Sequence, residues 1–346
     1  MCELFGLSCN RAVTVRFVWR GFVRRGREHR HGWGVAFYPD DRAVVVIKEP
    51  RPSVDSPMVQ ALKGLDFVRG RIVISHVRYA SVGDQVYRNT HPFVREVWGR
   101  EWVFAHNGTL HGLPEPQFYK PVGETDSEHA FCLLMDQVRK LGPDPDDELL
   151  RRTLEETALE ISKHGQFNFL MSDGRTLYAF CSSIEGLVYT IRAPPHKRRV
   201  ELVDKGEDED FDTICLGSEK GEDEIAAVVA TRRLTRGEPW YPLPDRILVA
   251  FRNGFPALTA LEQEVLRFIR QSPHRVSIEA IARGLDADVS AVTAAVDRLY
   301  RLCLINQDSR DPVPHKHAKA TYYTNRDLRP AIDFVLNQFG RSSLWD

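Results

Sequence analysis

The spacing of apolar residues changes near residue 256, and this change most constrains how the chain of 346 residues can fold. Before it, short runs rich in β-branched and aromatic residues predict strands, for example over 71–79 and 102–110. Two stretches in the middle, 127–138 and 147–163, have the spacing of amphipathic helices. Because these helices stand together and do not alternate with the strands, residues 2–256 are predicted to form an α+β or layered α/β/β/α domain, not a parallel βαβ repeat.

Residues 257–346 have a different pattern. We expect helices at 258–271, 277–285 and 289–304, then two short strands around a polar loop, and a last helix at 327–339. Three helices followed by a β-hairpin are typical of the winged form of the helix-turn-helix. The sequence therefore predicts a second, winged-helix-like domain over these residues.

This tail lacks the charge expected of a DNA-binding domain. It carries 12 Lys or Arg residues against 11 Asp or Glu residues. Its third helix begins with Asp286 and Asp288, where phosphates would lie, and Arg298 and Arg301 come only near the end. Nucleic-acid binding is therefore disfavoured, and dimerisation into a homo-oligomer or docking onto a partner protein is preferred.

The whole chain has a formal net charge of −1, so no global field attracts it to nucleic acid or to a membrane. We find no signal peptide and no apolar run long enough to cross a bilayer. The six cysteines include no CxxC pair, which fits a reducing compartment better than a disulfide framework. We therefore expect a cytoplasmic protein with no membrane partner.

Cys2, directly after the initiator methionine, is the first candidate for catalysis. If Met1 is removed, Cys2 carries both a thiol and a free α-amine, whose reference pKa of about 7.7–8.0 lets it accept a proton near neutral pH. An N-terminal amine that activates the side chain of its own residue is a known form of nucleophilic catalysis. The alternative is a small buried strand residue, and position alone favours that alternative.

Further candidates stand near the ends of predicted strands. Asn107 and Gly108 offer a side-chain NH2 and an unhindered backbone N–H for an oxyanion hole, although Asn-Gly is also the strongest turn signal in the chain. The guanidinium fork of Arg78 suits a carboxylate; its alternative is a surface ion pair. Asp126 would hold an ammonium or cap a helix. His91, before a proline, would position the substrate or Arg78, or be a structural histidine.

Metal binding has little support in the sequence. His29 and His31, and likewise His315 and His317, lack cysteine or carboxylate partners at the spacing of a ligand set. Neither a metal nor another cofactor is expected.

Five motifs follow Cys2 in one order. They are His31-Gly32-Trp33-Gly34, His76-Val77-Arg78-Tyr79-Ala80-Ser81, Asn89-Thr90-His91-Pro92-Phe93, His106-Asn107-Gly108 and Glu124-Thr125-Asp126-Ser127-Glu128. This series resembles the class II glutamine amidotransferase family of the N-terminal-nucleophile hydrolase superfamily. The first motif is similar to that of the small stand-alone branch of the family. The resemblance covers most of residues 2–256.

The resemblance implies a four-layer αββα fold and hydrolysis of glutamine to glutamate and ammonia. It also implies that Cys2 is the nucleophile, with its α-amine as base, and that Asn107 and Gly108 form the oxyanion hole. Arg78 would bind the α-carboxylate of glutamine, and Asp126 would bind its α-ammonium. Ser81 and His91 would line the pocket. We accordingly divide the chain into an amidotransferase domain, 2–256, and a winged-helix-like domain, 257–346.

The preferred hypothesis is a glutamine amidohydrolase that delivers ammonia to a separate partner enzyme or acts as a free hydrolase. A closely related possibility is an enzyme that cleaves γ-glutamyl amides or peptides. The competing hypothesis is a non-catalytic regulator that senses an amino acid and signals through the winged helix. Cys2 and Asn107 favour the enzyme, because a sensor needs Arg78 and Asp126 but no nucleophile.

Overall fold

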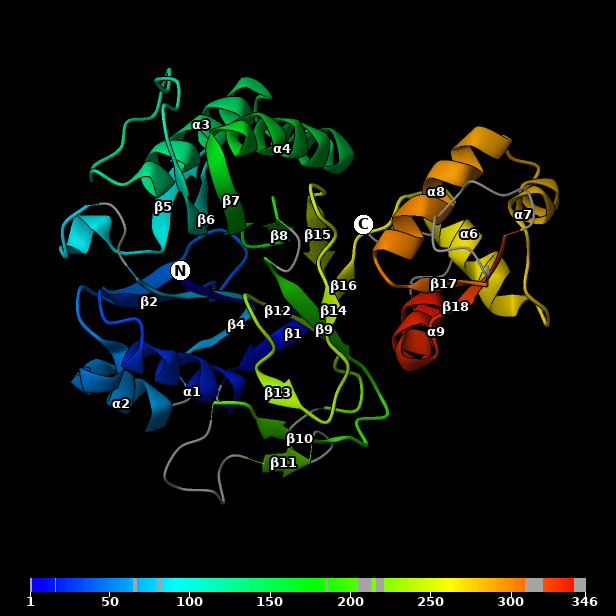
Figure 1. Ribbon diagram of the computed structural model, residues 1–346, viewed down its shortest axis with the longest axis horizontal. Helices are drawn as coiled ribbons and strands as arrows, with labels where there is room; N and C mark the ends of the chain where they lie inside the picture. The colour runs from blue at the N-terminus through cyan, green and yellow to red at the C-terminus, as the bar shows by residue number, and fades with distance from the viewer. Residues whose placement is uncertain are drawn as a thin grey trace. The chain divides into compact units, whose positions relative to one another are not determined.

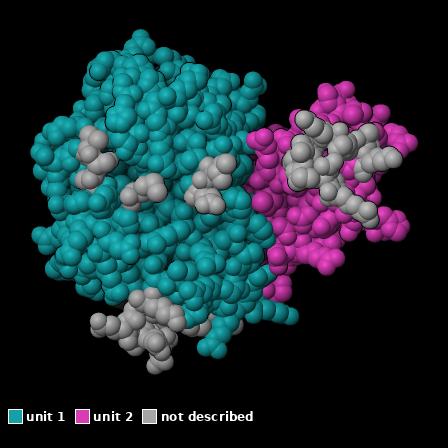
Figure 2. All heavy atoms as spheres, in the orientation of Figure 1, with its two compact units in different colours: residues 1–192, 196–255 teal, residues 193–195, 256–346 magenta. Residues whose placement is uncertain are grey.

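The computed structural model describes most of the chain, in eight segments: 2–15, 17–64, 67–79, 83–183, 186–204, 213–215, 221–308 and 320–338. The chain forms two compact units, which Figure 2 colours separately. The first unit comprises residues 1–192 and 196–255, and the second comprises residues 193–195 and 256–346.

The first unit is built around two large sheets whose paired strands are antiparallel. The seven-stranded sheet has the order β14 (Tyr241–Pro242), β9 (Val188–Arg192), β12 (Ala226–Ala230), β1 (Glu3–Thr14), β4 (Arg69–Val77), β2 (Trp33–Phe37) and β3 (Val45–Glu49). The six-stranded sheet has the order β16 (Phe255–Pro256), β15 (Val249–Arg252), β8 (Leu177–Phe180), β7 (Gly165–Ser172), β6 (Arg100–Leu110) and β5 (Phe93–Val97). A small third sheet has the order β11 (Thr213–Cys215), β10 (Arg199–Leu202) and β13 (Thr235–Arg236).

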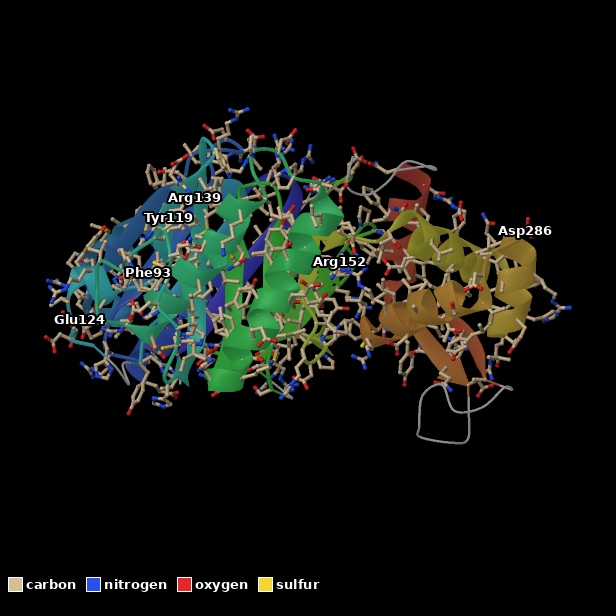
Figure 3. The ribbon with its side chains drawn as sticks, turned by 90° about the horizontal axis from the view of Figure 1, so that it is seen from above. Phe93, Tyr119, Glu124, Arg139, Arg152 and Asp286 are labelled. Carbon is tan, nitrogen blue, oxygen red and sulfur yellow. The ribbon has the colours of Figure 1, made fainter. Side chains whose placement is uncertain are left out.

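Helices cover the outer faces of the two large sheets. In Figure 1, α3 (Asp126–Lys140) and α4 (Asp147–Ile161) lie on the six-stranded sheet, and α1 (Phe17–Val23) and α2 (Pro57–Gly64) lie on the seven-stranded sheet. Figure 3, seen from above, shows α3 and α4 side by side. Short 3-10 helices occur at Arg24–Arg27, Ser53–Asp55, Tyr87–Asn89 and Ser162–His164. The unit is therefore α+β and rich in sheet, as the sequence predicts.

The central strands are buried on both faces, which explains their nearly continuous apolar sequence. Phe5 on β1 packs against Phe22 on α1, with ring centroids 5.6 Å apart. On the facing side, a Cβ added at Gly6 would lie only 2.9 Å from Cδ1 of Leu170 on β7. The two sheets thus approach closely at the start of β1, next to Cys2.

Some local elements differ from the sequence-based expectation. The cap of α3 is Thr125, whose side chain accepts a hydrogen bond from the Glu128 N–H, and not Asp126. Strand β1 continues to Thr14, and helix α1 begins at Phe17. The sequence analysis also did not identify α2, which has only eight residues.

The second unit contains three helices, an antiparallel strand pair and a last helix. They are α6 (Ala260–Gln271), α7 (Ile278–Leu285), α8 (Val289–Arg301), β17 (Ile305–Asp308), β18 (Thr321–Thr324) and α9 (Arg329–Gln338), with a short 3-10 helix at Arg326–Leu328. Thr259 and Glu262 form a reciprocal capping box at the start of α6. Apolar side chains from all four helices, including Val265, Ile281 and Leu299, are buried.

Among the residues that the structure describes, no helix combines the length and apolar composition needed to cross a membrane.

Candidate active site

The pairing of β1 with β4 brings Cys2 next to Arg78 and Tyr79. The register places Glu3 opposite Val77, so the residues at the two adjacent strand ends meet. The Tyr79 N–H donates to the Cys2 sulfur, and the thiol lies 3.3 Å from the Tyr79 carbonyl oxygen. The sulfur is therefore held at a fixed position beside the backbone that carries Arg78.

The thiol, the Arg78 guanidinium and the Asp126 carboxylate act on one another electrostatically. Burial raises the pKa of the Cys2 thiol; the backbone hydrogen bond with Tyr79 and the charge of Arg78 oppose this rise, and Asp126 adds to it. Burial lowers the pKa of Arg78, whereas Cys2 and Asp126 raise it. The structure thus brings together three of the residues that the sequence selected.

Backbone carbonyls hold the Arg78 side chain, which is only 2% exposed as a residue. Its Nη1 donates to the Asp84 carbonyl and its Nη2 to the Gly83 carbonyl, both at 3.1 Å. The Arg78 N–H also donates to the Gly32 carbonyl at 2.8 Å. A guanidinium presents its N–H donors as a planar fork, so these contacts fix the orientation of the Arg78 side chain.

Asn107 and Gly108 lie inside β6, which pairs Asn107 with Asn168 and Gly108 with Phe167 on β7. The expectation of a hairpin turn at this Asn-Gly pair is therefore wrong. Gly108 has φ of +156°, and a Cβ there would lie 1.8 Å from the Gln166 carbonyl oxygen. The glycine is required by this close approach of β7 and not by a turn. The Asn107 side chain makes no hydrogen bond to any described residue.

Asp126 is the first residue of α3, where the helix dipole favours a negative charge. Its Oδ2 accepts a hydrogen bond from the Leu110 N–H at 2.8 Å, and its Oδ1 accepts one from the Ser127 N–H at 3.0 Å. The Ser127 hydroxyl lies 2.9 Å from His106 Nδ1. The start of α3 is thus tied to the end of β6, which carries Asn107 and Gly108.

His91 is buried beside this group, and Ser81 lies outside the described residues. The His91 ring stacks on His76 with centroids 4.1 Å apart, and neither of its ring nitrogens has a hydrogen-bond partner among the described residues. Burial lowers the pKa of His91 well below its usual value and that of His76 to about 3, so both rings are neutral at pH 7. A Cβ at Gly34 would lie 2.3 Å from the His91 carbonyl oxygen, so only glycine allows this packing.

Glu3, the residue after Cys2, forms an ionic cluster that was not predicted from the sequence. Glu3 is 6% exposed and pairs with Arg25 at 2.5 Å and with Arg232 at 3.1 Å. The Thr231 hydroxyl donates to the same carboxylate, and His29 Nε2 lies 3.6 Å from it. The signal that could have identified this cluster was an acidic residue directly before the apolar start of a strand, Leu4-Phe5-Gly6-Leu7.

No group of three or more His, Cys, Asp or Glu side chains in the described part of the chain is arranged to hold a metal ion.

Comparison with known proteins assigns the chain to a family. The family described as class II glutamine amidotransferases matches residues 1–275. The chain belongs to the class II glutamine amidotransferases, a family of enzymes.

Three relatives show how far the similarity extends. An uncharacterized protein of Methanocaldococcus jannaschii is 38% identical over 98% of this chain and 97% of its own length. YafJ of Escherichia coli, named provisionally as a glutamine amidotransferase, is 36% identical over 69% of this chain and 93% of its own. The crystal structure of a predicted glutamine amidotransferase from Pseudomonas aeruginosa is 36% identical, covers 74% of this chain and all of its own, and has a TM-score of 0.57.

Proposed function

We propose that this enzyme hydrolyses the side-chain amide of glutamine with Cys2 as nucleophile, after removal of Met1. The observation that carries the proposal is the group formed by the Cys2 thiol, the Arg78 guanidinium and the Asp126 carboxylate. The guanidinium and the carboxylate are complementary to the α-carboxylate and α-ammonium of an amino acid. The thiol beside them is complementary to an electrophilic carbon in its side chain.

The reaction takes place in two stages. The α-amine of Cys2 accepts the thiol proton as the sulfur attacks the amide carbon, and the oxyanion accepts hydrogen bonds from the Asn107 NH2 and the Gly108 N–H. The C–N bond breaks, the amine returns the proton to the leaving nitrogen, and ammonia departs from a glutamyl thioester. Water then attacks the thioester, which releases glutamate and restores the thiol. The Asn107 amide, which makes no hydrogen bond to a described residue, and the glycine at 108 support this assignment.

The raised pKa of the thiol supports the need for a base. Because the pKa of the Cys2 thiol is raised, the thiol is protonated at neutral pH, and a nearby proton acceptor is required before the sulfur becomes a good nucleophile. The α-amine created by loss of Met1 would be attached to the same residue. We further propose that Ser81 and His91 line the substrate pocket.

Ammonia release from glutamine by the purified chain tests the proposal. We expect wild type and Cys303→Ala to release ammonia, and Cys2→Ala to release none, because Cys303 belongs to the second unit. Intact mass measurement should show that Met1 is absent from the active protein. Equal rates for wild type and Cys2→Ala would contradict the mechanism, and binding of glutamine without turnover would favour the amino-acid sensor instead.

Hydrolysis of γ-glutamyl amides or peptides uses the same attack with another leaving group. A γ-glutamyl peptide assayed beside glutamine distinguishes the two: a higher kcat/KM for the peptide would assign the enzyme to γ-glutamyl hydrolysis. We further propose that a separate enzyme accepts the ammonia. Co-purification from the native source tests for that partner.

We propose that the helix–sheet–sheet–helix order of the first unit is the four-layer αββα sandwich and that residues 2–256 form the amidotransferase domain. Residues 257–346 would be a winged-helix-like domain that mediates homo-oligomer formation or partner docking. The three helices and antiparallel strand pair of that unit support this assignment. Cys2, Cys9, Cys132, Cys181 and Cys303 are free thiols, in keeping with a cytoplasmic protein.

A further inference from the structure

The second unit contains a basic cavity that the amidotransferase chemistry does not use. Its volume is about 190 Å³, and it lies between the end of α6, strand β18 and the start of α9. The residues that line it are Ile269, Arg270, Ser272, Pro273, His274, Arg275, Tyr323, Thr324, Arg326 and Arg329. None of these described residues is acidic.

Arginine residues are clustered around this cavity far more than in the rest of the unit. Residues 257–346 contain 12 Lys or Arg residues and 11 Asp or Glu residues, so the unit as a whole is nearly neutral. Four of those 12 basic residues nevertheless line one small cavity. A local excess of positive charge in a nearly neutral unit indicates a site for an anion.

Two of the arginines are held in place by ion pairs beside the cavity. Arg270 forms a two-pronged pair with Asp333, with N–O distances of 2.7 and 2.8 Å. Arg275 pairs with Asp308, and its guanidinium lies 5.0 Å from the centre of the Tyr323 ring. These pairs fix the directions of both side chains and leave further N–H donors on each guanidinium.

The other two arginines are not neutralised in this way. Arg329 Nε donates to the Thr324 hydroxyl at 3.2 Å, and Arg326 forms no hydrogen bond or ion pair with any described residue. Both stand at the start of the last helical segment, where the helix dipole disfavours cations. Arg270 lies at the end of α6, where the helix dipole stabilises a positive charge. Arg326 and Arg329 lie at the opposite, unfavourable end of the last helical segment. A bound anion would compensate this arrangement.

We propose that this cavity binds a phosphoryl group of a small soluble molecule. Guanidinium forks match phosphate oxygens geometrically, and a helix N-terminus adds to the attraction of an anion. The Ser272 hydroxyl and His274 supply further polar contacts. The volume accommodates such a group with several waters.

The structure favours a small ligand over a nucleic acid. The cavity is a compact concave site, whereas a nucleic-acid backbone requires an extended basic surface. Asp286, labelled in Figure 3 at the end of α7, and Asp288 at the start of α8 place negative charge on another part of this unit. These aspartates would repel a backbone that extended across them.

Calorimetric titration of the full chain with inorganic pyrophosphate, at constant ionic strength, tests the proposal. We expect wild type to bind one pyrophosphate per chain and the double variant Arg326→Gln/Arg329→Gln to bind at least about tenfold more weakly. The control Arg283→Gln/Arg301→Gln removes the same charge from exposed positions outside the cavity and should keep the wild-type affinity.

Two further measurements make the outcome decisive. The single variant Arg326→Gln changes an exposed side chain that makes no hydrogen bond or ion pair with a described residue, so a loss of affinity there points to the cavity and not to misfolding. No binding by wild type, or equal binding by wild type and the double variant, would overturn the proposal. A short duplex DNA that binds more tightly than pyrophosphate, and loses affinity in the same double variant, would also overturn it in favour of nucleic-acid recognition.

Discussion

The substitution Glu3→Gln tests the role of the ionic cluster that follows the nucleophile. The Glu3 carboxylate pairs with Arg25, whose side chain is fully buried, and accepts from the Thr231 hydroxyl. Loss of one partner of a buried ion pair costs about 3–5 kcal/mol. Glutamine keeps an acceptor oxygen, and Asp204 still pairs with Arg25 at 2.8 Å. We therefore expect a smaller loss, about 2–3 kcal/mol of unfolding free energy.

The matched control is Glu160→Gln, which makes the same chemical change at the surface. Glu160 pairs with Lys163, and both side chains are at least 65% exposed. Such a pair contributes about 0–1 kcal/mol. The two variants thus differ in burial and not in the atoms replaced.

Urea unfolding followed by tryptophan fluorescence measures the difference. Five of the six tryptophans precede residue 256, so the signal reports mainly on the first unit. The unfolding midpoint of Glu3→Gln should fall well below that of Glu160→Gln with an unchanged slope. If the two variants unfold at the same urea concentration, the cluster does not stabilise the start of β1 and the reasoning is refuted.

Three further predictions follow from single contacts. In the same urea assay, Gly108→Ala should lower the unfolding free energy of the first unit by more than about 2 kcal/mol, because the added Cβ would clash with the Gln166 backbone. The control Gly112→Ala, at φ of +65° with open space around it, should cost about 1 kcal/mol. Equal losses would contradict the packing argument. Burial lowers the pKa of Lys48 from 10.5 to about 8, so between these pH values the unfolded chain binds more protons than the folded chain. The unfolding free energy of wild type should therefore rise with pH across this range relative to that of Lys48→Met. Parallel curves of unfolding free energy against pH for the two proteins would contradict this prediction. Arg78→Lys keeps the charge but loses the fork, so steady-state kinetics should show KM for glutamine raised about tenfold or more with a smaller change in kcat; an unchanged KM would remove Arg78 from substrate binding.

The sequence was sufficient where a signal is local or ordered along the chain. The Thr259 capping box, the amphipathic spacing of α6 and the strand-rich character of the first unit could all be predicted from residue types. The family could be recognised because five short motifs follow Cys2 in one order. None of these inferences requires knowing which strands pair.

The sequence was insufficient where pairing between distant segments decides the outcome. Asn107 and Gly108 carry a strong turn signal, but eight consecutive pairs with β7 keep them in a strand. The proximity of Cys2 to Arg78 depends on the register of β1 with β4. The Glu3 cluster joins residues more than 200 positions apart, and no local pattern encodes such a contact.

The central claim is that one terminal residue supplies both the nucleophile and its base. The most direct measurement is mass spectrometry of the N-terminal peptide after rapid acid quenching during glutamine turnover. The account predicts a peptide that begins at Cys2 and carries a glutamyl group on its sulfur. A chain that releases ammonia while retaining Met1, or that carries the glutamyl group on another residue, would contradict it.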